Sequence, residues 1–256
     1  RSTLFPYTTL FRSVKFAYIA GVAWALEQEG LGPVSGFDAA LYSCVPLGGG
    51  LSSSAALEAS TCVALDEVCG LGLAGTVEEP DDAGRARLVT SCVRAENEMA
   101  GAPTGGMDQS ASLRCREGHA LELDCRTGEV AQVPFDLAAA GLALLVIDTK
   151  AKHSLVDGQY GARRAACERS AEVLGVDLLA DIDAQDLDQA LERLASCEAD
   201  DADELVRRTR HVVTEIDRTR RLVALLQDGR PLTGDTLTAV GALLNGSHDS
   251  LRDDYE

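Results

Sequence analysis

The fold of this chain is decided by one stretch, Val45-Pro46-Leu47-Gly48-Gly49-Gly50-Leu51-Ser52-Ser53-Ser54-Ala55-Ala56-Leu57-Glu58-Ala59. It predicts the end of a strand, a glycine loop and the start of a helix. Consecutive glycines let the backbone turn tightly and approach a ligand closely. The first N–H groups of the following helix lack partners within the helix and lie at its positive dipole end, so they favour phosphate. A flexible turn with a serine N-cap is the alternative interpretation.

The glycine loop differs from two common nucleotide-binding motifs. No Gly-Lys-Ser/Thr follows the glycines, so the loop is not a P-loop. No glycine occupies the last position of a Gly-x-Gly-x-x-Gly pattern either. Serine hydroxyls at the start of the helix can donate hydrogen bonds to phosphate or ligate Mg2+.

Three stretches resemble one protein family, and they occur in the family's order. Pro46 to Ala56 resembles the second signature motif of the GHMP small-molecule kinases, in the form that galactokinases have. Glu96 to Gln109 is similar to the galactokinase segment with the metal-binding glutamate and the catalytic aspartate, and Ser247 to Glu256 to a stretch near the family's C-terminal part. The resemblance implies an α/β (α+β) fold of two lobes. The N-terminal lobe would be ribosomal-S5-domain-2-like and the C-terminal lobe ferredoxin-like, both incomplete.

The resemblance also implies the ligands and the residues that bind them. ATP and Mg2+ would be the cofactors and galactose the second substrate. Ser54 and Glu96 would hold Mg2+, and Asp108 would take the proton of the sugar C1 hydroxyl. The sugar would contact the Gly105 backbone, Asp108 and Tyr160. The expected ATP and phosphate site comprises Pro46, Gly48, Gly49, Gly50, Leu51, Ser52, Ser53, Ser54 and Ala55.

Each of the three side chains beyond the loop has a structural alternative. Glu96 fits an ordinary acid on a helix surface. Asp108 follows Gly106-Met107 and fits a helix N-cap. Tyr160 lies on an apolar helical stripe and fits a core tyrosine.

The implied activity is phosphorylation of galactose to galactose 1-phosphate, a step of galactose catabolism. A kinase for N-acetylgalactosamine or another sugar is the near alternative. A non-catalytic sensor of galactose and ATP is a second alternative, ranked lower because Ser52-Ser53-Ser54-Ala55 and Asp108 are intact.

Two family motifs have no match. Neither the first, which carries a phosphoryl-stabilising arginine and a sugar-binding Glu-His-x-Asp run, nor the third, a glycine-rich run, is found. We therefore expect the middle part of a galactokinase, with little or no activity alone. We interpret residues 1–13 as a non-native leader, 14–133 as a partial ATP-binding N-terminal lobe and 134–256 as a partial C-terminal lobe.

Composition places the chain among globular proteins. Its 256 residues are 46% apolar and 25% charged, with a formal net charge of −18. This charge argues against nucleic-acid or anionic-membrane partners, and no apolar run is long enough for a bilayer. The eight cysteines form no Cys-x-x-Cys pair, which favours reduced thiols in a cytoplasmic protein. We expect a monomer.

Periodicity predicts the remaining elements. Alternating residues predict a hairpin of 120–124 with 130–135 around Thr127-Gly128, and a strand at 36–45. The apolar run 142–147 predicts a buried strand. Arginines between 207 and 221 indicate either a basic patch or, as the interleaved acids favour, a solvated face with ion pairs. Helices are predicted at 15–29, after the glycine loop, and at 84–99, 159–174, 186–195, 204–227 and 235–244.

Overall fold

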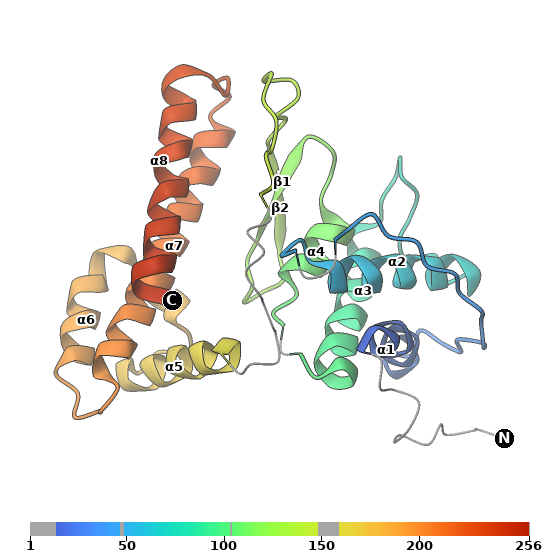
Figure 1. Cartoon of the computed structure of the whole chain (residues 1–256), viewed down its shortest axis with the longest axis horizontal. Helices are drawn as coiled ribbons and strands as arrows, with labels where there is room; N and C mark the ends of the chain where they lie inside the picture. Colours follow the sequence, from blue (N-terminus) through green and yellow to red (C-terminus); the bar gives the residue numbers. More distant parts are fainter. Residues whose placement is uncertain (1–13, 47–48, 103, 148–158, 256) are drawn as a thin grey trace. The chain divides into compact units, whose positions relative to one another are not determined.

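The computed structural model describes residues 14–46, 49–102, 104–147 and 159–255. It combines helices with a two-stranded sheet, a mixed α/β architecture (Figure 1). The chain divides into two compact units, Arg1–Gln132 with Leu145–Val156, and Val133–Leu144 with Asp157–Glu256. The helices are α1 (Val14–Gln28), α2 (Ser53–Val68), α3 (Asp82–Arg94), α4 (Met107–Arg114), α5 (Gln159–Leu174), α6 (Leu187–Ala195), α7 (Ala202–Gln227) and α8 (Gly234–Ser250).

Shorter elements complete the description. The strands are β1 (His119–Leu123) and β2 (Val130–Pro134). Two segments are π-helical, η1 (Ala95–Ala100) and η4 (Leu251–Tyr255). Two are 3-10 turns, η2 (Leu179–Asp181) and η3 (Ala184–Asp186).

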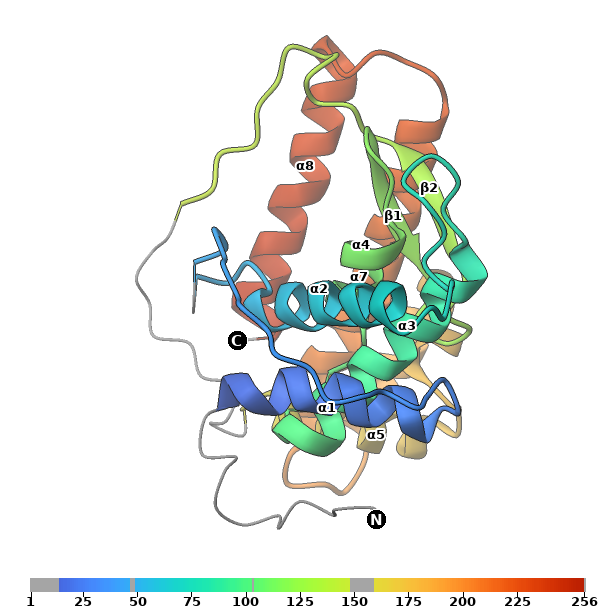
Figure 2. The same ribbon diagram turned by 90° about the vertical axis from the view of Figure 1, so that its right-hand side faces the viewer.

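The first unit has a core of helices that pack on one another. Helices α1 and α2 lie side by side, and both contact α3 (Figure 2). The shared apolar core includes Val22 and Leu26 of α1, Cys62 of α2, and Leu88 and Cys92 of α3, each fully buried. Helices in globular proteins are stabilised mainly by such packing.

A tight contact fixes the start of α3. Asp81 is its N-cap, and the Asp81 carboxylate accepts a hydrogen bond from the Gly84 N–H at 3.1 Å. A Cβ on Gly84 would lie 2.0 Å from the Leu73 carbonyl oxygen. Only glycine therefore fits this position.

The second unit is also built from packed helices. Leu194 of α6, Leu205 of α7 and Ala166 of α5 share one buried cluster. A smaller cluster joins Val133 of β2 to Leu226 of α7 and Val240 of α8. The two clusters lie along α7, which supports the unit over most of its length.

The sequence predicts the helices and the hairpin correctly, but two strand predictions are wrong. Residues 36–45 and 142–147 form no strand in the structure. Extended residues become a strand only when they pair, and these pair with no strand among the described residues. The apolar side chains of the second segment are exposed, with Leu145 at 80% and Ile147 at 72%.

The arginines of α7 form ion pairs, as their interleaved acids predict. Arg218 pairs with Glu215, and Arg221 with Asp217 at 3.5 Å. Arg208, however, is buried rather than solvated, and its guanidinium lies over the Tyr255 ring.

Within the described ranges, no helix has the length and apolarity needed to cross a bilayer. The proposed leader, residues 1–13, lies outside the described part of the chain.

Candidate active site

The glycine loop leads into α2 through a left-handed backbone. Gly50 has a φ of +71° and Ser52, the N-cap of α2, a φ of 51°. A non-glycine residue in this region costs free energy and is found most often at functional sites. The Ser52 side chain makes no capping hydrogen bond, so the first-turn N–H groups of α2 stay available to a ligand. Leu47 and Gly48 lie outside the described residues.

Glu96 lies in the π-helical turn η1, directly after α3. Such turns are rare and frequently mark functional sites. The Glu96 side chain is buried, with the residue 3% exposed, so the interpretation as a surface acid is wrong. Burial raises the pKa of Glu96, hydrogen bonds from Ser54 and Gln109 lower it, and the nearby charge of Asp108 raises it. The structure thus brings together the three side chains that the resemblance selects from α2, η1 and α4.

Two further buried side chains complete this cluster. The amide nitrogen of Gln109 donates to Glu96 Oε2 at 2.5 Å and to Glu58 Oε2 at 2.9 Å. Glu58 and Gln109 are both fully buried. Burial, the largest effect, raises the pKa of Glu58 to about 8, although its hydrogen bond from Gln109 acts in the opposite direction.

Asp108 is the second residue of α4 and is half-buried. The N-cap of α4 is Gly106, with a φ of 83°, so the interpretation of Asp108 as the N-cap is wrong. The loop before Gly106 is tied to η1, because the Thr104 N–H donates to Asn97 Oδ1 at 2.7 Å. The Ala102 N–H also donates to the Glu96 carbonyl at 3.0 Å. These bonds hold Asp108 at a fixed place beside Glu96.

Residues 17–116 match the family described as GHMP kinases N terminal domain. These residues belong to the GHMP kinase family. The matched range contains the glycine loop, Glu96 and Asp108, so the site described above lies within this kinase domain.

The chain is similar to galactokinases over nearly its whole length. The Streptomyces coelicolor galactokinase is 50% identical over 239 residues, which are 93% of this chain and 56% of the relative. The human galactokinase is 38% identical over 258 residues, 98% of this chain and 59% of the relative. The chain thus spans about half the length of the curated relatives it matches.

A solved structure supports the GHMP kinase fold. The Lactococcus lactis galactokinase complexed with galactose superposes with a TM-score of 0.68 at 27% identity. The match covers 93% of this chain and 56% of that one. The α/β fold class expected from the resemblance is therefore confirmed.

The kinase motifs do not reveal every member of the site. Glu58 lies one helical turn after Ser54, and its position in an apolar helix was the signal available. Gln109 directly follows Asp108. Tyr18 of α1 lies near the cluster, and burial first and then the charges of Glu96 and Glu58 raise the pKa of its hydroxyl.

For two of the predicted sugar-binding residues, the structure gives the position of the backbone alone. Gly105 is exposed in the loop before α4. Tyr160 is the second residue of α5 and belongs to the second unit, and its side chain lies outside what the structure describes.

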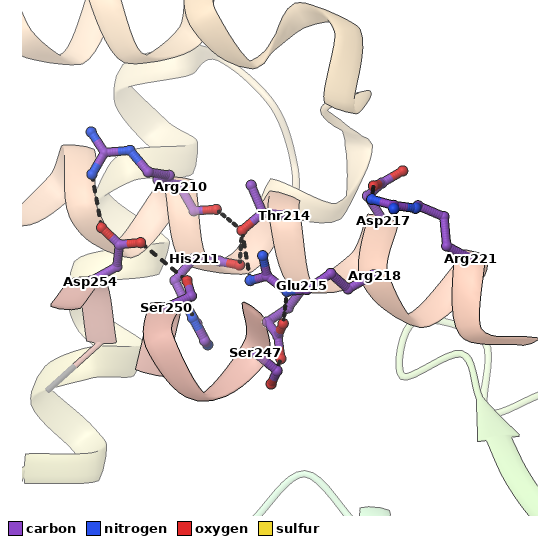
Figure 3. A network of polar contacts seen from close by, with 10 residues as sticks. All are labelled: Arg210, His211, Thr214, Glu215, Asp217, Arg218, Arg221, Ser247, Ser250 and Asp254. Atoms are coloured by element: carbon purple, nitrogen blue, oxygen red, sulfur yellow. Dashed lines mark hydrogen bonds and ion pairs between the residues drawn. The ribbon is translucent and has the colours of Figure 1, made fainter. Parts of the chain in front are cut away.

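The C-terminal stretch that resembles galactokinases, beginning at Ser247, contacts α7 within the second unit (Figure 3). Ser247 donates to Glu215 Oε2 at 2.6 Å, and Asp254 pairs with Arg210 at 2.8 Å. Between them, the Ser250 hydroxyl lies 3.0 Å from His211 Nδ1 and donates to Asp254 Oδ2 at 3.1 Å. These contacts hold α8 and η4 against α7.

Proposed function

We propose that this chain is the ATP- and metal-binding part of a kinase that phosphorylates the C1 hydroxyl of galactose. The observation that carries the proposal is the convergence of Ser54, Glu96 and Asp108 on one buried cluster beside the glycine loop. Galactokinase relatives that cover nearly the whole chain support the choice of sugar. Gly105, Asp108 and Tyr160 are the proposed sugar-binding residues.

The start of α2 fits a phosphate site. Its first N–H groups and the serine hydroxyls would bind the phosphates of ATP, with the glycine loop allowing close approach. The proposed residues are Pro46, Gly48, Gly49, Gly50, Leu51, Ser52, Ser53, Ser54 and Ala55.

The pair Ser54 and Glu96 fits Mg2+. The Ser54 hydroxyl is close enough to the Glu96 carboxylate to lower its pKa, and hard oxygen ligands of this kind suit Mg2+, which keeps several waters and phosphate oxygens as further ligands. Bound Mg2+ would neutralise charge on the phosphates as the phosphoryl group moves. Within the described residues, no group of three His, Cys, Asp or Glu side chains could hold a metal by itself, so the phosphates must complete the site.

Asp108 is the proposed general base. An ionised carboxylate can accept the proton of a sugar hydroxyl when it is held within hydrogen-bonding reach. The bonds that tie the preceding loop to η1 hold Asp108 in place relative to Glu96. The carboxylate would take the proton of the C1 hydroxyl as the hydroxyl oxygen attacks the γ-phosphorus, while the bond from the γ-phosphorus to the β–γ bridging oxygen breaks and ADP leaves.

The proposed lobe boundary lies close to the break between the two units at Gln132 and Val133, although Leu145–Val156 belongs to the first unit. We assign residues 14–133 to the ATP-binding lobe and 134–256 to the C-terminal lobe.

None of the eight cysteines forms a disulfide, which supports a reducing, cytoplasmic location. We propose that the protein acts as a monomer.

Thermal melts test this function. A ligand that binds only the folded chain raises the melting midpoint. At a ligand concentration of 100 times Kd, the folded state is stabilised by about 2.7 kcal/mol. We expect Mg-ATP to raise the midpoint of the wild-type chain, and Glu96→Gln to lose the increment that Mg2+ adds to ATP. A cooperative melt that Mg-ATP does not move would contradict the proposal. Galactose-dependent ATP turnover measures the complete reaction.

A further inference from the structure

One side-chain amide joins three elements of the proposed site. The Gln109 nitrogen donates to Glu96 Oε2 at 2.5 Å and to Glu58 Oε2 at 2.9 Å. These residues come from α4, η1 and α2 respectively. An amide NH2 has two hydrogens, so both are used. The amide therefore holds one oxygen of each carboxylate in place.

The bridge reaches each residue of the site. Glu58 lies four residues after Ser54, on the same face of α2. Gln109 is the direct neighbour of Asp108 on α4. A change at the Gln109 amide would therefore be felt first by Glu96 and also by the helices that present Ser54 and Asp108.

The cluster is costly as a purely structural cross-link. Glu58 Oε1 and Gln109 Oε1 are buried and have no hydrogen-bond partner among the described residues. Leaving a buried polar atom unsatisfied is unfavourable, and apolar side chains of the same shape would avoid this loss. A role in placing Glu96 accounts for the presence of polar groups at these buried positions.

We propose that Gln109 is a positioning residue that acts through Glu96 on the bound metal, with Glu58 as its anchor. The inference rests on the proposed function, because it requires Glu96 to be a metal ligand. Outer-shell groups that orient a ligating carboxylate typically change metal affinity by roughly 10–100-fold when they are removed.

Manganese binding tests the inference without relying on turnover. Mn2+ replaces Mg2+ as the probe, and the electron paramagnetic resonance signal of free Mn2+ measures its affinity in the presence of ATP. Gln109→Met keeps the length of the side chain and removes both hydrogens. We expect about tenfold weaker Mn2+ binding or more, with unchanged affinity for ATP in EDTA and a cooperative melt.

Gln132→Met is the matched control. The Gln132 amide donates to the Arg114 carbonyl at 2.8 Å in the same unit, away from Glu96. This variant should keep wild-type Mn2+ affinity. If Gln109→Met melts without cooperativity, Gln109→Asn takes its place. It keeps both hydrogens but withdraws them by one methylene, and we again expect weaker Mn2+ binding.

The outcomes separate the inference from the function on which it rests. Wild-type Mn2+ affinity in a folded Gln109 variant, with binding lost in Glu96→Gln, overturns the positioning role and leaves the metal site standing. Equal losses in the Gln109 and Gln132 variants would also overturn it. If Glu96→Gln binds Mn2+ as the wild type does, the proposed metal site itself is wrong.

Discussion

Gly21 of α1 packs directly against Ala95, the first residue of the π-helical turn. A Cβ on Gly21 would lie 3.0 Å from Ala95 Cβ and 3.1 Å from Met99 Cβ. The absence of a side chain thus lets α1 support the turn that carries Glu96.

We expect Gly21→Val to push α1 away from this turn. Overpacking of a close contact costs about 1–3 kcal/mol, and the displaced turn should also weaken Mn2+ binding. Chemical denaturation measures the free energy of unfolding. The control is Gly241→Val in α8, where a Cβ would meet nothing within 4 Å. An unchanged unfolding free energy for Gly21→Val would show that the contact yields easily.

Asp66 should be important for stability. Its buried carboxylate accepts from the backbone N–H groups of Leu73 at 2.8 Å and Ala74 at 2.9 Å. Asp66→Asn places an amide donor where an acceptor is needed, so we expect a loss of about 1–3 kcal/mol in denaturant unfolding. The exposed neighbour Glu67, changed to Gln, should have little effect. Comparable losses in both variants would contradict this prediction.

Glu58 should make stability depend on pH. Its pKa is about 8 in the folded chain and near 4.5 when unfolded, so between these values the folded state holds a proton that the unfolded state has released. Stability must therefore fall as pH rises through this window. In EDTA, we expect Glu58→Gln to be increasingly stabilised relative to wild type from pH 5 to pH 8, by an amount on the order of a few kcal/mol.

The control for the Glu58 experiment is Glu172→Gln, an exposed acid of α5. Its stability relative to wild type should be the same at both pH values. A Glu58→Gln curve parallel to that of the wild type would rule out the raised pKa.

His211 should have the opposite dependence. Burial lowers its pKa below 6.5, so the unfolded state takes up a proton before the folded state does. The stability that neutral His211 provides is complete above the unfolded pKa and is lost as pH falls. We expect the wild type to lose more stability than His211→Gln between pH 7 and pH 5. His248→Gln, at an exposed position, should follow the wild type.

The sequence predicts the main residues of the proposed site because short motifs can be recognised without knowing how the chain packs. Ser54, Glu96 and Asp108 are found by comparison with short family patterns, and the structure brings them together. Glu58 and Gln109 were not predicted, because whether a carboxylate on a helix is buried depends on what packs against it. Periodicity within one helix does not contain that information.

The strand predictions failed for a related reason. Apolar alternation shows that a segment can form a strand, but pairing decides whether it does. The hairpin of β1 and β2 supplies its own partner across a short turn, with the Gly128 N–H donating to the Asp124 carbonyl at 2.8 Å. Residues 36–45 and 142–147 have no such local partner in the part of the chain that the structure describes.

The π-helical turn has a consequence for changes in chain length. Each residue of an α-helix rotates the chain by about 100°, and a π turn holds one residue more than an α turn. Deleting Asn97 would convert the π turn to an α turn. Glu96 would stay in place, and the loop that leads to Asp108 would begin one residue earlier. The spacing between the two acids is therefore set by residue count, and length variants between 96 and 108 should be far less tolerated than substitutions there.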